Sequence, residues 1–156
     1  MKDYQGNIPK YRRSTWFILH LANPLARYFS GRLGWGTSSG IRILKVKGSK
    51  TGKIYSIPIR LLELDKKKYL VALQGETFWV KNLRKQKGNG QIEFGGRTTD
   101  FSSKELPDQE KLPILRAYLK KWWSVSRPLT TVTSPDAPYD EIRKAAPLHP
   151  VFELTS

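Results

Sequence analysis

The segment KGSKTGKIYSIPIR, residues 47–60, decides the fold because a tight turn leads directly into a strand. Gly48 and Gly52 stand four residues apart, and glycine permits the compact backbone that a turn needs. From residue 55 to residue 61, apolar side chains alternate with Ser56, Pro58 and Arg60, which is the period of a β-strand. The preceding IRILKV, residues 41–46, also has strand composition. The segment is therefore predicted to be a hairpin, with Pro58 at an edge or a bulge.

The rest of the chain continues this mixed pattern. The pattern predicts a turn at 65–68, a strand at 69–74, a helix at 77–86, a hairpin around Gly95 and Gly96, a helix at about 109–123, a loop at 124–138, a short helix at 139–146 and a strand at 151–154. Residues 14–33 are expected to be helical, with a break at Asn23 and Pro24.

These elements amount to about six strands, several of them in consecutive antiparallel hairpins. No alternation of strand and helix indicates a doubly wound parallel sheet. The expected class is α+β, mainly β: a small antiparallel barrel or half-barrel with flanking helices. The 156 residues are enough for one domain, in which 1–33 would form an N-terminal helical arm.

Charge narrows the range of partners. The formal net charge is +15, and residues 1–60 hold 12 of the Lys and Arg residues but only one acid, Asp3. Such a field attracts nucleic acid, anionic lipid headgroups or a multiply charged small molecule. The longest apolar run is 16–22, which is too short to span a membrane, and the N-terminus has no signal-peptide core. A cytoplasmic location is expected.

Residues that carry chemistry are scarce. The chain has no cysteine, and His20 and His149 stand far apart, so both are interpreted as packing or loop residues. No metal-ligand spacing, nucleophile motif or dinucleotide motif occurs. An enzyme with this sequence would need a cofactor to supply its reactivity.

The basic turn is suited to a phosphate. Backbone N–H groups of such a turn can form an anion-binding concavity, and the hydroxyls of Ser49 and Thr51 add hydrogen-bond donors. Lys50 and Lys53 add charge-assisted donors. A solvated hairpin without a ligand remains the alternative from these residues alone.

The turn and the segments after it resemble a known family. GSKTGKIYSIPI (48–59) is similar to the glycine-rich basic turn and following proline of the deazaflavin-dependent nitroreductases, which bind F420 and have a split β-barrel fold. YLVALQGETFWVKNLRK (69–85) resembles that family's strand, glycine loop and W-x-x-N-L helix. IEFGGRTTDF (92–101), the segments 115–123 and 137–154, and NPLARYFSGRLGW (23–35) continue the similarity in order.

The resemblance implies a role for each matching position. The turn residues would hold the cofactor phosphate and the start of its glutamate tail: Ser49, Lys50, Thr51, Gly52 and Lys53. Tyr55 and Pro58 would border the cofactor, and Ala72, Gln74 and Gly75 would lie along its ring system. Trp79 and Asn82 would contribute from the helix. Tyr139, in the C-terminal aromatic segment, is a candidate for the substrate pocket, with simple packing as the alternative. The catalytic proton donor is left open.

The implied activity is hydride transfer from reduced F420 to a quinone, a nitroaromatic or another conjugated acceptor. Two departures from the family pattern, Gln74 in place of a cation and a short loop from Gly75 to Phe78, keep FMN as an alternative cofactor. The charge favours F420, whose polyglutamate tail is anionic. The alternatives are an FMN-binding split barrel, a non-catalytic F420 carrier and a basic nucleic-acid-binding module, although no nucleic-acid recognition motif is present.

The N-terminal segment carries a further expectation. Apolar residues 16–19 are flanked by Arg12, Arg13, Arg27 and Arg32, and a helix of this kind can lie in an anionic membrane surface. Packing of those residues on the barrel is the alternative. If the arm binds lipid, contact should be weak and reversible, since each basic residue contributes only about 1 kcal/mol. The oligomeric state is left open.

Overall fold

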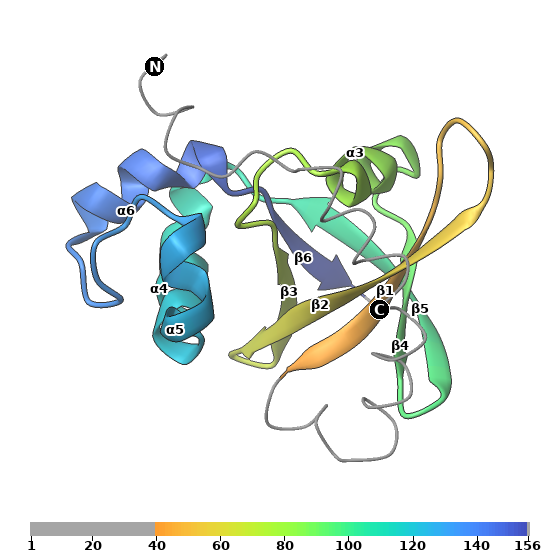
Figure 1. Ribbon diagram of the computed structural model, residues 1–156, viewed down its shortest axis with the longest axis horizontal. Helices are drawn as coiled ribbons and strands as arrows, with labels where there is room; N and C mark the ends of the chain where they lie inside the picture. Colours follow the sequence, from red (N-terminus) through yellow and green to blue (C-terminus); the bar gives the residue numbers. More distant parts are fainter. Residues whose placement is uncertain (1–39, 156) are drawn as a thin grey trace.

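A computed structural model describes residues 40–155, so the predicted N-terminal arm and His20 lie outside the described residues. In that part of the chain six strands form a closed antiparallel barrel in the order β1-β2-β3-β6-β5-β4 (Figure 1). The strands are β1 (Ile41–Lys47), β2 (Ile54–Leu64), β3 (Lys67–Val71), β4 (Gly90–Phe94), β5 (Arg97–Glu105) and β6 (Val151–Thr155). The prediction of a mainly β, six-stranded antiparallel barrel with helices around it is confirmed.

In the hairpin of β1 and β2, strand β2 has a second neighbouring strand over only part of its length. The two strands pair from Ile41 opposite Arg60 to Lys47 opposite Ile54. The pairing of β2 with β3 begins only at Leu61, opposite Leu70. Residues 54–60 of β2 are therefore bonded to a neighbouring strand on one side alone. This explains Pro58, which lacks a backbone N–H and is accommodated where a strand has an unpaired side.

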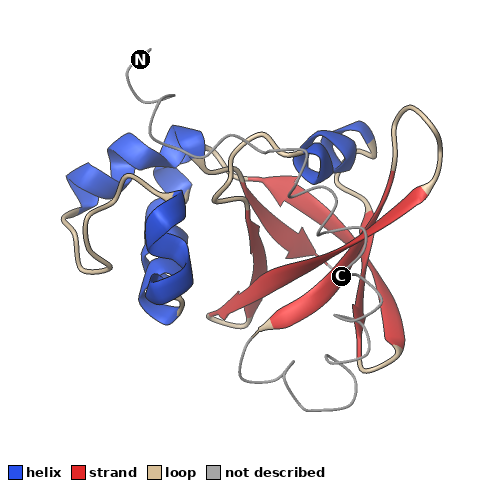
Figure 2. Ribbon diagram, in the orientation of Figure 1, coloured by secondary structure: helices blue, strands red, loops and turns tan. Residues whose placement is uncertain are grey.

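Two apolar cores lie on the two faces of the barrel wall. The interior core includes Leu44, Ile57, Leu70 and Phe152, and helix α3 (Phe78–Lys85) covers one end of the barrel with its buried face. The strand period of two places alternate residues on the outside. There, residues such as Tyr69 pack in a second core with side chains of the C-terminal helices. Figure 2 shows these helices on one side of the barrel.

The C-terminal helices form a layer on one side of the barrel. They are α4 (Leu112–Lys121), α5 (Trp123–Ser126) and α6 (Tyr139–Ala145), with the short 3-10 helices η2 (Asp108–Glu110), η3 (Arg127–Leu129) and η4 (Ala146–Leu148). Leu115 and Leu119 of α4 are buried, as the helical pattern predicts. This helical layer lies beside residues 54–60 of β2, the stretch that pairs with a neighbouring strand on one side alone.

Some predicted boundaries are wrong. The turn expected at 65–68 consists only of Asp65 and Lys66, which both have positive φ, as in the two-residue turns that match strand twist. Lys67 is already in β3, where its ammonium pairs with Glu153 at 3.1 Å, so its polarity reflects an exposed strand position. β3 ends at Val71, and residues 72–77 form a loop. The loop expected at 124–138 contains the end of α5 and all of η3, and the helix expected at 109–123 is α4 alone, preceded by η2.

Candidate functional site

The basic turn between β1 and β2 is held by its own backbone. The N–H of Gly48 donates to the carbonyl of Lys53 at 2.7 Å, and the N–H of Gly52 donates to the carbonyl of Gly48 at 3.1 Å. Gly52 has a φ of +70°, a conformation that favours glycine. The N–H of Lys53 donates to the hydroxyl of Thr51 at 3.3 Å. Gly52 and Lys53 thus shape the turn through their backbones.

Helix α3 completes a cavity against this turn. The backbone N–H of Ser49 donates to Oδ1 of Asn82 at 3.2 Å, although the two residues are 33 positions apart. The ring of Tyr55 meets that of Phe78 edge-on, with centroids 5.6 Å apart. A cavity of about 310 Å³, called here the turn cavity, lies between them. It is lined by Gly48, Ser49, Lys50, Thr51, Tyr55, Phe78, Lys81 and Asn82.

The turn cavity has the electrostatics of an anion site. Lys50 of the turn and Lys81 of the helix line it, and no Asp or Glu of the described chain does. Backbone N–H groups, hydroxyls and Tyr55 supply further donors. The sequence-based prediction grouped the turn with Asn82, and the structure brings these together. Lys81 was not predicted, although it directly precedes Asn82 in the helix motif.

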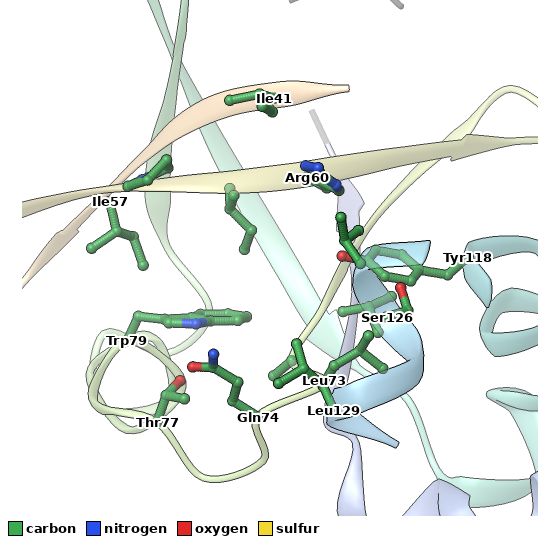
Figure 3. A pocket seen from close by; sticks show the side chains of 15 residues that line it. Ile41, Ile57, Arg60, Leu73, Gln74, Thr77, Trp79, Tyr118, Ser126 and Leu129 are labelled. Carbon is green, nitrogen blue, oxygen red and sulfur yellow. The ribbon is translucent and has the colours of Figure 1, made fainter. Parts of the chain in front are cut away.

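A second cavity, of about 360 Å³, lies where β2 is unpaired and is called here the barrel cavity (Figure 3). Its lining includes four predicted residues: Pro58, Ala72, Gln74 and Trp79. Gly75 lies in the adjoining loop, where its N–H donates to the carbonyl of Ala72 at 3.0 Å. Its φ of +78° lets the chain turn back from the cavity towards α3.

The two cavities share β2 and α3. Tyr55 lines the turn cavity and Ile57 lines the barrel cavity, and these residues face the same way because they are two apart in a strand. Phe78 and Asn82 of α3 face the turn, whereas Trp79 faces the barrel cavity. An elongated ligand with an anionic group at the turn could therefore extend along β2 into an apolar space.

The barrel cavity also contains polar groups that the sequence did not single out. Arg60, Thr77, Tyr118 and Ser126 line it, and none of its lining residues is acidic. Nε of Arg60 and the hydroxyl oxygens of Thr77 and Ser126 are buried and have no hydrogen-bond partner among residues 40–155. Burial raises the pKa of Tyr118 to about 12, partly offset by the charge of Arg60, so this phenol stays protonated at neutral pH.

The sequence alone gave some indication of Arg60 but none of Tyr118 and Ser126. Arg60 stands in the hairpin segment, where its position on β2 was predictable but its neighbours were not. Tyr118 and Ser126 carry no motif, because only the packing of α4 and α5 against the barrel brings them to the cavity.

Tyr139 does not line either cavity. It begins α6, its side chain is exposed, and the guanidinium of Arg116 stacks over its ring at 3.7 Å from the centroid. The structure thus places this candidate for the substrate pocket on the outer surface of the helical layer. Tyr118, in α4, is the tyrosine that lines the barrel cavity.

Other candidate chemistry can be placed for residues 40–155. His149 is buried beneath η4, with Nε2 3.0 Å from the hydroxyl of Thr130, and burial lowers its pKa to about 4. In that range no group of three or more His, Cys, Asp and Glu residues could hold a metal ion. No helix of the described chain is long and apolar enough to cross a membrane.

The barrel order, the unpaired stretch of β2 and the helical layer define a split β-barrel. A solved structure described as an F420-H2 dependent reductase (FDR-A) has this fold, with 18% identity and a TM-score of 0.50 over 74% of this chain and 94% of that chain. A protein described as a domain-swapped dimer matches with 16% identity and a TM-score of 0.54, over 92% of this chain and 100% of that one. A nimC/nimA family protein from Clostridium acetobutylicum matches with 13% identity and a TM-score of 0.50, over 80% of this chain and 81% of that chain.

At these identities the likeness establishes the fold, and the resemblance in fold to the deazaflavin-dependent proteins is confirmed. No protein-family model matches the chain. No curated protein matches it in sequence.

Proposed function

We propose that this protein is an oxidoreductase that binds F420 and reduces a conjugated organic acceptor, such as a quinone or a nitroaromatic. One observation carries the proposal: the hydrogen bond from Ser49 to Asn82 joins the two motif segments around one cavity with cations and no acids. The shared fold with a protein described as an F420-H2 dependent reductase supports it.

The residues present fit such a cofactor. The turn cavity would hold the phosphate through Lys50, Lys81 and the donors of the turn, and the glutamate tail would extend past exposed Lys53. The ring system would lie along β2, against Pro58 and the loop that carries Ala72 and Gln74.

When bound in its reduced form, F420 supplies the hydride. The protein's own part is to bind, orient and exclude water. Ile57, Leu73, Trp79 and Leu129 give the barrel cavity an apolar lining, which strengthens the polar interactions inside it. Tyr118 is protonated at neutral pH and lines this cavity, so it is the residue best placed to donate a hydrogen bond to an acceptor there.

Cofactor choice depends on charge. Gln74 removes one cation from the loop that carries a basic residue in the resembling family, and Lys81 offers a cation from α3 instead. A net charge of +15 favours the longer, more anionic F420 over FMN.

Side-by-side fluorescence titrations with F420 and FMN test this proposal. We expect tighter binding of F420, and a preference that shrinks as salt is added. Equal or tighter binding of FMN would contradict the cofactor assignment. Turnover of menadione with reduced F420 then separates a reductase from a carrier, since a carrier binds the cofactor without oxidising it. Salt-sensitive DNA binding without F420 binding would instead favour the nucleic-acid alternative.

A further inference from the structure

The barrel cavity contains hydrogen-bond donors but no carboxylate. Its polar side chains among the described residues are Arg60, Gln74, Thr77, Tyr118 and Ser126, and no Asp, Glu or His of residues 40–155 lines it. Gln74 and the hydroxyls of Thr77, Tyr118 and Ser126 can also accept hydrogen bonds, whereas the guanidinium of Arg60 only donates. A cavity of this composition favours a ligand with acceptor oxygens and disfavours a cationic one.

The donors are divided between the two ends of the cavity. Figure 3 shows Arg60, on β2, at the same end as Tyr118 and Ser126, whereas Gln74, Thr77 and Trp79 lie at the other end. Trp79 and Gln74 belong to the end that adjoins α3 and the turn cavity. The Arg60 end is therefore the one left for a second molecule when a cofactor extends from the turn.

Two groups at this end lack partners. Ser126 is 1% exposed, and its hydroxyl oxygen makes no hydrogen bond to any described residue. Nε of Arg60 is likewise buried and unbonded, and the guanidinium pairs with no carboxylate among residues 40–155. Buried polar groups are nearly always satisfied in folded proteins, so unpaired donors that share a cavity indicate a missing acceptor.

The surroundings hold these donors in place. The guanidinium of Arg60 lies over the ring of Trp122, 5.8 Å from its centroid, and Trp122 is itself buried in the outer core. The ring of Tyr118 packs edge-on against the same indole, with centroids 4.7 Å apart. One buried tryptophan thus orients both the cation and the phenol at this end of the cavity.

We infer that the Arg60 end binds a carboxylate, so that the acceptor is a planar conjugated molecule bearing a carboxylate group. Arg60 would pair with the carboxylate, and Ser126 and Tyr118 would donate to its oxygens. Apolar lining residues of the cavity, such as Ile57, Leu73 and Leu129, would cover the conjugated part. This inference rests on the proposed function for the word acceptor, whereas the carboxylate subsite stands on the cavity alone.

Calorimetric titration with matched probes tests the subsite without a cofactor. The probes are 2-naphthoate, 2-naphthamide and 2-naphthylmethylamine, which share an aromatic body and differ in the polar group. We expect 2-naphthoate to bind roughly 10- to 100-fold more tightly than 2-naphthamide, as a charge-assisted hydrogen bond predicts. The amine should bind most weakly. Equal affinity for the acid and the amide would overturn the inference.

Variants separate the subsite from the general positive field. Arg60→Met keeps a long side chain but removes the charge, and should abolish the preference for 2-naphthoate. Lys120→Met is the control, because Lys120 is an exposed residue of α4 that pairs with Asp136 and does not line the cavity. A preference retained in Arg60→Met, or lost equally in Lys120→Met, would refute a specific site.

Ser126→Ala covers the case in which Arg60→Met does not fold. Its hydroxyl has no hydrogen-bond partner in the described part of the chain, so the fold should tolerate the change. We expect several-fold weaker binding of 2-naphthoate with unchanged binding of 2-naphthamide, and an equal loss for both probes would contradict the subsite. F420 titration of the same samples keeps the two proposals apart. If F420 does not bind but the preference for 2-naphthoate is retained, only the cofactor assignment is rejected. If F420 binds but 2-naphthoate is not preferred, only the carboxylate subsite is rejected.

Discussion

Replacing Lys50 by alanine is the most direct perturbation of the turn cavity. Lys50 lines the cavity from the turn, is exposed, and has no ion-pair partner among the described residues. Its removal leaves no buried group unsatisfied, so the variant should fold with unchanged stability. What it removes is one of the two lysines that line the turn cavity and that we propose to contact the cofactor phosphate.

The magnitude follows from the type of contact. A hydrogen bond to a charged group contributes about 1.5–3 kcal/mol, which corresponds to roughly 10- to 100-fold in affinity. Because Lys50 is exposed, solvent screens its charge, and the lower end of that range is expected. Lys81 faces the same cavity, so Lys81→Ala should weaken binding similarly. The losses in the double variant should be non-additive, because both groups would contact one anion.

The assay is fluorescence titration with F420 at low and at physiological salt. Lys120→Ala is the matched control, since it removes an exposed lysine that lies outside the cavity and pairs with Asp136 at 3.1 Å. The difference between wild type and Lys50→Ala should narrow with salt, because the Debye length falls to about 8 Å at physiological ionic strength. If Lys50→Ala binds F420 normally, or if Lys120→Ala loses as much, the anion site is not in this turn.

Four further outcomes are expected. Asn82→Asp keeps an oxygen that can accept the N–H of Ser49 but adds a negative charge to the turn cavity. F420 affinity should therefore fall at least about 10-fold, while the melting temperature stays unchanged. Normal affinity for F420 would place the phosphate elsewhere. Arg84→Met should lower the free energy of unfolding in urea by about 1–2 kcal/mol. Arg84 bonds the half-exposed carboxylates of Glu76 and Glu105 and so ties the loop before α3 to the end of β5. No change would show that solvent screens these pairs fully. Burial lowers the pKa of His149 in the folded protein to about 4. Between pH 4 and 6.5 the unfolded chain therefore binds more protons than the folded one. The free energy of unfolding should fall as the pH drops through that window, by roughly 3 kcal/mol at most. His149→Gln should flatten that part of the pH profile of stability, and an unaltered profile would assign the effect to other groups. The full chain should co-sediment with anionic but not neutral liposomes at low salt and a chain starting near Gly34 should not; no binding by the full chain would reject the membrane role of 1–33.

The sequence by itself determined the local elements. Alternation from Tyr55 to Leu61, the glycines of the basic turn and the buried face of α4 follow from neighbours within a few residues, so their patterns were readable. The turn and the helix with Asn82 could be grouped as one candidate site, although that grouping came from resemblance. Even local readings failed where one residue type suits two roles, as with Lys67, which is a strand residue that looked like part of a turn.

Only the tertiary structure decided how the barrel closes and what its cavity contains. Pairing of β6 between β3 and β5, and of β1 with β4, joins segments that no local pattern connects. Arg60, Tyr118 and Ser126 come from β2, α4 and α5, and they meet because the helical layer packs beside the stretch of β2 that lacks a second partner. Tyr139 was a candidate for the substrate pocket, with simple packing as the alternative, and α6 presents it to solvent beside Arg116. Which residues a side chain contacts across the fold depends on how whole helices and strands pack together. The energy of that packing comes from the whole chain and not from a local sequence pattern.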